Sequence, residues 1–173
     1  MPIDYLAAAE KYRPAVIKTL LVGEAPPPKG KTYFYVPSAA SRLHIPIDQD
    51  TSLPSTIFHH YFQQRPCDID EYHKFLVRLQ DMGVFLVDLH DENIRVRKND
   101  EGLQRIIESI PLLRQKLLDR EIKVGEKDIT FLLARNSYRS KIRREFPDSK
   151  LIRWKDFRLT VAGGTPMGEN DAR

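Results

Sequence analysis

Three segments of the chain are almost continuously apolar, and each stops abruptly at a polar turn. They run from Ala15 to Val22, from Val84 to Leu89 and from Ile129 to Ala134. Short apolar runs without alternation are typical of strands that are buried on both faces, as in a parallel sheet. We therefore predict three strands there, and a fourth within Leu151 to Val161, where the pattern is less regular.

The segments between these runs carry apolar residues at helical spacing. One predicted helix, over residues 69–81, is marked at both ends. Asp68 is a suitable N-cap, and Glu71 is in place to complete a capping box. Gly83 suits the left-handed residue that follows such a helix. The other predicted helices cover residues 3–12, 103–110, 111–120 and 136–146, and one more, capped by Ser52 or Ser55, extends through Gln64.

Strands and helices alternate along the chain, and no internal repeat is present. This alternation predicts an α/β fold, a sandwich in which helices cover both faces of a parallel sheet. A length of 173 residues suits one domain with a substantial core. We expect a single domain over residues 1–173, with a loose C-terminal tail from about residue 162.

Composition places the chain among soluble globular proteins, with 41% hydrophobic and 30% charged residues. No apolar run is long enough to span a membrane, and the N-terminus lacks the basic-then-apolar order of a signal peptide. The single cysteine, Cys67, cannot form an internal disulfide. We therefore expect a cytoplasmic protein without a membrane partner, associated with the nucleoid if DNA is its ligand.

The net charge of +4 is unevenly distributed, because arginines crowd the segment after the third strand. Such a run is either a solvated helix face or a surface that holds nucleic-acid phosphates. The residues that would contact a nucleic-acid backbone are Arg135, Arg139, Arg143 and Arg144.

Two carboxylates follow predicted strands: Glu24 after the first and Asp88 at the end of the second. In open α/β sheets, ligands bind at the carboxyl ends of the strands. If the two strands are neighbours, both side chains face one crevice, where a carboxylate can activate a water or stabilise a developing positive charge. Alternatively, each carboxylate caps the backbone amides of its own turn.

We expect no cofactor and no metal site. The sequence contains neither the phosphate-binding loop that ends in Gly-Lys-Ser/Thr nor the dinucleotide motif Gly-x-Gly-x-x-Gly. Cys67 has no partner cysteine for a zinc site. His59 and His60 are adjacent, so on a helix they point in different directions.

Three aromatic residues, Tyr33, Phe34 and Tyr35, follow the proline-rich turn after Glu24. An aromatic ring near a ligand site can stack on a nucleobase. Side chains at strand-like spacing alternate between two faces, however, so we expect one ring in a pocket and the others in the core.

The segment Leu21-Val22-Gly23-Glu24-Ala25-Pro26 resembles the first motif of the uracil-DNA glycosylase superfamily, especially its Gly-Glu-Ala-Pro-Gly branch. The form with additional prolines, followed by Phe34-Tyr35, is similar to a set of uncharacterised glycosylase-like proteins. In order and spacing the resemblance covers Ala15 to Val161, and its first motif is the specific part.

The resemblance implies a three-layer α/β/α sandwich with a central four-stranded, mainly parallel sheet. It implies hydrolysis of an N-glycosidic bond in DNA, as in DNA repair. Glu24 would handle the attacking water, and Phe34, or else Tyr33 or Tyr35, would stack on the flipped base. Gly23 and Ala25 would shape the base pocket. Asp88 occupies the position of the asparagine that reads the base edge.

The chain departs from this family at three places. An ionised aspartate at position 88 accepts hydrogen bonds but cannot donate them. Pro27 replaces the glycine of the first motif, and Gly163-Gly164-Thr165-Pro166 stands where the family has His-Pro-Ser. Two alternatives to a glycosylase therefore stay open: a non-catalytic module that binds nucleic acid or a nucleotide, and a protein-interaction subunit with a vestigial pocket and an interface patch at His59, His60, Tyr61 and Phe62.

Overall fold

The computed structural model describes residues 3–27, 33–36, 45–46, 49–94, 101–133 and 135–157. The predicted tail from about residue 162 and the end of the predicted fourth strand lie outside these residues. All four predicted strand regions contain a strand, and these form one parallel sheet in the order β2-β1-β3-β4. The strands are β1 (Thr19–Gly23), β2 (Val84–Asp88), β3 (Ile129–Leu133) and β4 (Lys150–Arg153).

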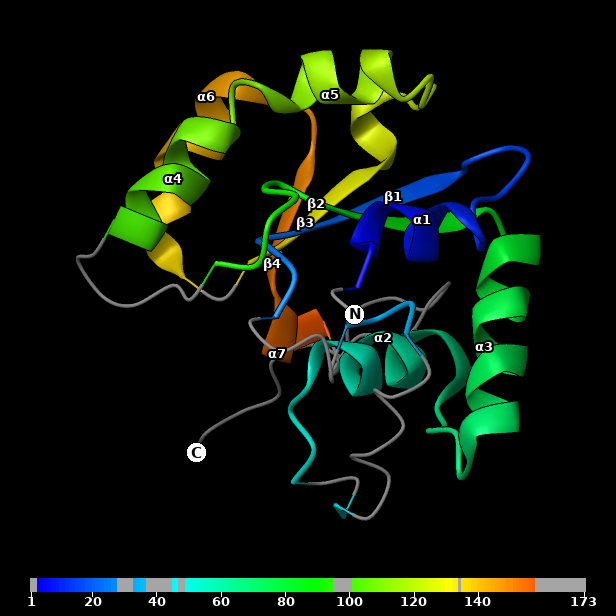
Figure 1. Ribbon diagram of the computed structural model, residues 1–173. Coiled ribbons are helices and arrows are strands. Elements are labelled where there is room, and N and C mark those ends of the chain that lie inside the picture. The colour runs from blue at the N-terminus through cyan, green and yellow to red at the C-terminus, as the bar shows by residue number, and fades with distance from the viewer. Residues whose placement is uncertain are drawn as a thin grey trace, which may run out of the picture.

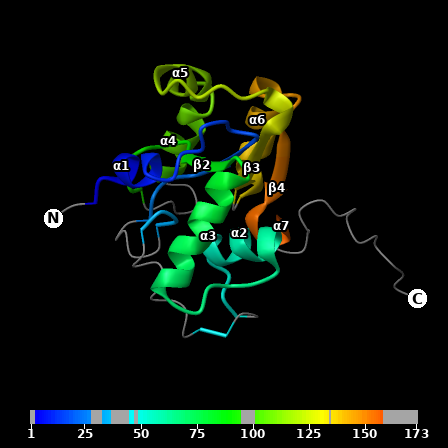
Figure 2. The same ribbon diagram turned by 90° about the vertical axis from the view of Figure 1, so that its right-hand side faces the viewer.

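Helices cover both faces of this sheet, as predicted (Figure 1, Figure 2). The helices α2 (Leu53–Phe62), α3 (Ile69–Asp81) and α7 (Trp154–Phe157) lie on one face. The other face carries α4 (Glu101–Ser109), α5 (Leu113–Asp119) and α6 (Arg139–Glu145). The short α1 (Tyr5–Glu10) lies beside the β2 edge, and the 3-10 helices η2 (Glu126–Asp128) and η3 (Asn136–Tyr138) precede and follow β3.

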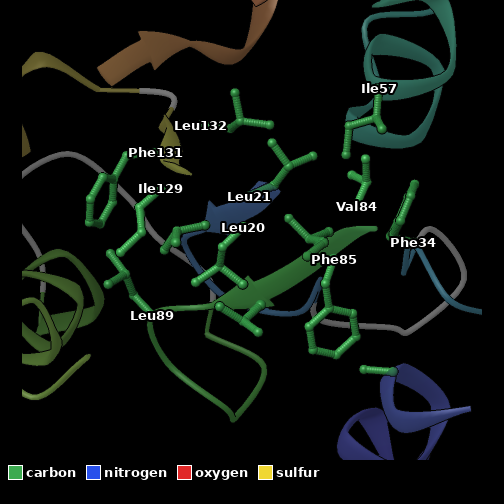
Figure 3. Close-up of a cluster of buried hydrophobic side chains, with 14 of the residues drawn as sticks. Leu20, Leu21, Phe34, Ile57, Val84, Phe85, Leu89, Ile129, Phe131 and Leu132 are labelled. Atoms are coloured by element: carbon green, nitrogen blue, oxygen red, sulfur yellow. The ribbon is translucent and has the colours of Figure 1, made fainter. Parts of the chain in front are cut away.

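The strands β1, β2 and β3 are apolar because both of their faces are covered. Every residue of β2 and of β3 is buried. Figure 3 shows Leu20 and Leu21 of β1 at the centre of the apolar cluster, with Phe34 and Ile57 on one side and Phe131 on the other. The edge strand β4 is only half-buried, which explains its weaker sequence pattern.

The helix over 69–81 is confirmed as α3 with both predicted ends. The Asp68 carboxylate accepts a hydrogen bond from the Glu71 N–H at 2.7 Å. The Glu71 carboxylate in turn accepts from the Cys67 N–H at 2.6 Å. Gly83 has a φ of 78°, and a Cβ there would meet the carbonyl oxygen of Val16 at 2.9 Å. Both ends were predictable because capping depends on residues close in sequence.

Several predicted boundaries are wrong. The first strand begins at Thr19 rather than Ala15, because Val16 is 68% exposed and the chain turns there before it enters the sheet. The fourth strand begins one residue before its predicted region, at Lys150, and ends within it at Arg153, where α7 begins. The predicted basic helix over 136–146 is divided into η3 and α6. The N-terminal helix spans only Tyr5–Glu10. Of the two predicted caps for α2, Ser52 is the one that the structure confirms.

Candidate functional site

The carboxyl ends of β1 and β2 lie side by side. Gly23 is paired with Asp88 in the parallel register. The pairing continues past the strands, since the Leu89 N–H donates to the Gly23 carbonyl at 2.9 Å and the His90 N–H donates to the Glu24 carbonyl at 3.0 Å. The fold therefore brings Glu24 and Asp88 to adjacent strand ends.

The strand order also changes direction beside β1. The chain passes from β1 to β2 on one side, and β3 lies on the other side of β1. In doubly wound sheets, ligands bind at the carboxyl edge where the direction reverses. Glu24 follows β1 at this point, and Arg135 comes shortly after the neighbouring β3.

Gly23 makes room for the Asp88 side chain. A Cβ at position 23 would lie 2.6 Å from Asp88 Oδ1 and 3.9 Å from Cδ2 of Leu53. The first distance is far inside van der Waals contact, so the Asp88 carboxyl group occupies the space that any other residue at position 23 would need. This requirement accounts for the glycine at the end of β1.

The Asp88 side chain is buried, and the residue is 8% exposed. Burial raises the pKa of its carboxyl group to about 7, and the nearby carboxylates of Asp91 and Glu24 add to this effect. Lys116 and Arg120 act in the opposite direction, but they do not cancel it. Asp88 can therefore gain and lose a proton near neutral pH, as a general acid or base must do.

A small cavity of about 20 Å³ lies against Asp88. This is room for roughly one water molecule. Its wall includes Tyr5 of α1, Pro26 and Tyr33, together with Asp91 and Arg120. Glu24 is not part of this wall. The polar groups around the cavity are of the kind that hold a buried water.

Lys116 of α5 fixes the chain as it leaves β2. Its ammonium group donates to the carbonyl oxygens of Asp88 at 3.0 Å and Leu89 at 2.7 Å, and to Asp91 Oδ1 at 2.9 Å. These three bonds use all three donors of the lysine. Lys116 therefore positions the end of β2 and the Asp88 backbone.

Arg120, at the end of α5, lies between the Asp88 cavity and a second hollow. Its Nη2 donates to Glu10 Oε1 at 2.6 Å. Its Nε is buried and has no hydrogen-bond partner in the part of the chain that the structure describes. A buried donor without a partner is costly unless a water or a ligand satisfies it.

The second hollow is an open pocket of about 640 Å³ beside α5 and the segment that follows β2. Its wall shares Leu6, Asp91 and Arg120 with the small cavity. This volume lies within the range of about 300–1,000 Å³ that is usual for small-molecule sites. We call it the α5 pocket.

The aromatic residues are placed mainly in the core. Phe34 is 4% exposed, and its ring packs against Phe58 with the ring centres 5.5 Å apart. The Tyr35 hydroxyl accepts from the Leu86 N–H at 2.7 Å and donates to the Leu86 carbonyl at 3.2 Å. Tyr33 alone of the three lines the Asp88 cavity, with its hydroxyl 3.3 Å from the carbonyl of Tyr5.

The arginines singled out in the sequence lie elsewhere. Arg139, Arg143 and Arg144 are exposed on α6, and Arg135 is half-buried after β3. None of the four lines the Asp88 cavity or the α5 pocket. Ala25, between Glu24 and the cavity-lining Pro26, is half-buried and packs against the core.

The predicted interface patch is not an exposed surface. His60 is only 9% exposed, and its ring stacks on Phe157 with the ring centres 3.7 Å apart. His59, Tyr61 and Phe62 are half-buried. His60 and Tyr61 pack on Phe157 of α7, and Phe62 packs on Phe75 of α3.

Sequence reasoning missed Lys116, Arg120, Asp91 and Tyr5. Lys116 and Arg120 are four residues apart on one helix, which places them on the same side. Nothing in the sequence indicated that this side of the helix would meet the end of β2. Lys116 and Asp88, for example, are 28 residues apart in the chain.

No family model, curated protein or solved structure matches the chain with significant similarity. In the described part of the chain, no helix has the length and apolar character that a membrane crossing requires.

Proposed function

We propose that the domain binds a nucleobase at the carboxyl edge of β1 and β2 and hydrolyses the N-glycosidic bond that joins the base to its sugar. The observation that carries this proposal is the buried Asp88 carboxyl group, whose pKa of about 7 accompanies a cavity the size of one water. A base with a pKa near the working pH is well matched to activating water. The resemblance of the Gly23-Glu24-Ala25-Pro26 motif to uracil-DNA glycosylases supplies the reaction class.

In this mechanism the Asp88 carboxylate takes a proton from the water in the small cavity. The water oxygen forms a bond to the C1′ carbon of the sugar as the C1′–N bond breaks. The electron pair of that bond goes to the base nitrogen, which then takes a proton from solvent. The α5 pocket shares Leu6, Asp91 and Arg120 with the small cavity, and in this proposal the sugar of a ligand in the pocket reaches the water across these residues.

Glu24 has a different role in this proposal from the one that the family resemblance implies. The water-sized cavity is walled by Asp88 and not by Glu24. Glu24 follows the neighbouring strand and contributes to the raised pKa of Asp88. Glu24 lines neither the small cavity nor the α5 pocket, so we assign it to holding the pKa of Asp88 high through its negative charge.

A second candidate is a nucleic-acid-binding module without catalysis. The exposed arginines Arg139, Arg143 and Arg144 on α6 favour it, because they can contact phosphates away from the pocket. The two functions differ in product formation. Base release should be measured with free nucleosides and with oligonucleotides that contain uracil, hypoxanthine or xanthine. Release that is lost in Asp88→Asn supports the enzyme; salt-dependent binding without release supports the module.

A further inference from the structure

The α5 pocket has an uneven distribution of charge. Three of its carboxylates, those of Asp91, Glu92 and Asp119, belong to exposed residues and so lie toward the mouth. Its two cations, Lys116 and Arg120, are deeper, with side chains 16% and 14% exposed. A ligand that enters this pocket meets negative charge first.

Lys116 and Arg120 do not offset the repulsion between the mouth carboxylates and an anionic ligand. All three donors of Lys116 are engaged by Asp88, Leu89 and Asp91. The Arg120 charge is paired with Glu10. A phosphate in the pocket would therefore be repelled by the mouth carboxylates and would gain no free ammonium group.

One buried donor nevertheless lacks a partner among the described residues, and a ligand reaches it when the Arg120 side chain shifts. The Arg120 Nε is buried, has no partner among the described residues and belongs to a side chain that lines both cavities. A carbonyl oxygen of a ligand would satisfy it. The carboxylates at the mouth accept hydrogen bonds only, so they suit N–H groups of a ligand.

We propose that the α5 pocket takes a neutral nucleoside whose base carries both N–H donors and a carbonyl oxygen, and that it discriminates against phosphate-bearing nucleotides. This inference rests on the function proposed above and assigns its substrate class as free nucleosides. Arg120 is then the residue that determines specificity, because its Nε–H reads the carbonyl.

Calorimetric titration of the full chain tests this without depending on turnover. The probes are guanosine and cytidine, which carry amino and carbonyl groups, their 5′-monophosphates, and adenosine, which lacks a carbonyl. We expect each of the two nucleosides to bind at least fivefold more tightly than its monophosphate and more tightly than adenosine. Equal or tighter binding of the monophosphates, or no binding of either nucleoside, overturns the inference.

Two variants examine Arg120 directly. Arg120→Met removes the donor, and Arg120→Lys keeps a cation for Glu10 but removes the guanidinium N–H. Both should weaken guanosine and cytidine binding about tenfold or more, since a hydrogen bond from a charged group is lost, and leave adenosine binding unchanged. Arg105→Met, on the exposed side of α4, is the matched control and should change nothing. Unchanged guanosine and cytidine binding in both Arg120 variants overturns the assignment.

A variant that removes one mouth carboxylate tests the repulsion of phosphate, even if Arg120 is needed for folding. In Asp119→Asn the side-chain oxygen can still accept from Gln115, as Oδ1 does at 2.7 Å. We expect monophosphate binding to strengthen several-fold relative to nucleoside binding, because one of the mouth charges that repel phosphate is removed. Asp81→Asn, at the exposed end of α3, is the control. If Asp119→Asn prefers nucleosides over monophosphates as strongly as the wild type does, the mouth carboxylates are not what repels phosphate. Base release without a nucleoside preference would remove this inference alone, and nucleoside binding without release would remove the catalytic function alone.

Discussion

The carboxyl group of Asp88 fills the space beside Gly23, so that a Cβ at position 23 would lie 2.6 Å from Asp88 Oδ1. This contact joins the Gly23-Glu24-Ala25-Pro26 motif to the end of β2. The glycine leaves space in which a buried carboxyl group, a water-sized cavity and the neighbouring Glu24 are brought together. Gly23 is therefore required by the position of the Asp88 side chain.

Replacing Gly23 by alanine tests that contact. Because the methyl group would collide with a buried carboxyl group, we expect Gly23→Ala to lower the free energy of unfolding by about 1–3 kcal/mol, measured by urea denaturation. Gly125→Ala is the control, since a Cβ there meets only Asp128 Oδ2, at 3.2 Å. In the double variant with Asp88→Ala, the cost at position 23 should largely disappear. A full cost that persists without the Asp88 side chain would show that another contact is responsible.

The pKa of Asp88 predicts how stability depends on pH. The folded protein holds this proton to a pH of about 7, whereas an unfolded aspartate loses it near pH 3.9. The contribution of this group to stability is therefore fully present below about pH 4 and is lost as the pH rises through 7, by about 4 kcal/mol in total.

Asp88→Asn removes that dependence. Because the amide stays neutral, we expect the variant to be more stable than the wild type at pH 8 and to lose less stability between pH 4.5 and 8, as measured by urea denaturation across that range. Asp70→Asn, exposed on α3, should leave the wild-type profile intact. If the free energy of unfolding rose by the same amount between pH 4.5 and 8 in the wild type and in both variants, a buried, protonated Asp88 would be contradicted.

Lys116→Met should loosen the end of β2. The variant loses three hydrogen bonds from one ammonium group, two of them to the backbone oxygens of Asp88 and Leu89. We expect a loss of about 2–3 kcal/mol in the free energy of unfolding and a further rise in the pKa of Asp88, because Lys116 lowers it. The pKa can be followed by carboxyl NMR titration, with the exposed Lys123→Met as control. An Asp88 that titrates at the wild-type pH would argue against the assigned role of Lys116.

Tyr35 substitutes for a neighbouring strand at the open edge of β2. Its hydroxyl satisfies both the N–H and the carbonyl of Leu86. Tyr35→Phe leaves a buried N–H without a partner, so we expect a loss of about 1–3 kcal/mol in urea denaturation. Tyr5→Phe, which loses only a 3.3 Å bond to the Pro27 carbonyl, should cost less. Equal costs for the two variants would mean that the edge bonds of Tyr35 add nothing.

The sequence allowed prediction of those features that depend on neighbouring residues or on the general geometry of parallel sheets. The ends of α3 are capped by residues within four positions of one another, so Asp68, Glu71 and Gly83 could be identified directly. The approach of Glu24 to Asp88 followed from placing two parallel strands side by side.

The remaining features depend on packing between distant segments. Val16 is apolar but exposed, because the chain turns there and its backbone meets Gly83 before β1 begins. One of the rings of Tyr33, Phe34 and Tyr35 was expected in a pocket, and only the packing shows that Phe34 fills the core against Phe58 while Tyr33 lines the Asp88 cavity. Lys116 and Arg120 reach the site only because α5 crosses the end of β2. No local pattern marks them.

Base release by the purified protein is the measurement that decides whether Asp88 activates a water for hydrolysis. Free nucleosides and base-modified oligonucleotides should be incubated with the wild type, Asp88→Asn and Glu24→Gln, and the released base quantified between pH 5 and 9. We predict that the wild-type rate rises about tenfold per pH unit below 7 and levels off above it, as Asp88 becomes ionised. Asp88→Asn should lose at least a hundredfold in rate. Release by Asp88→Asn at the wild-type rate, or no release from any substrate by the wild type, would contradict the account.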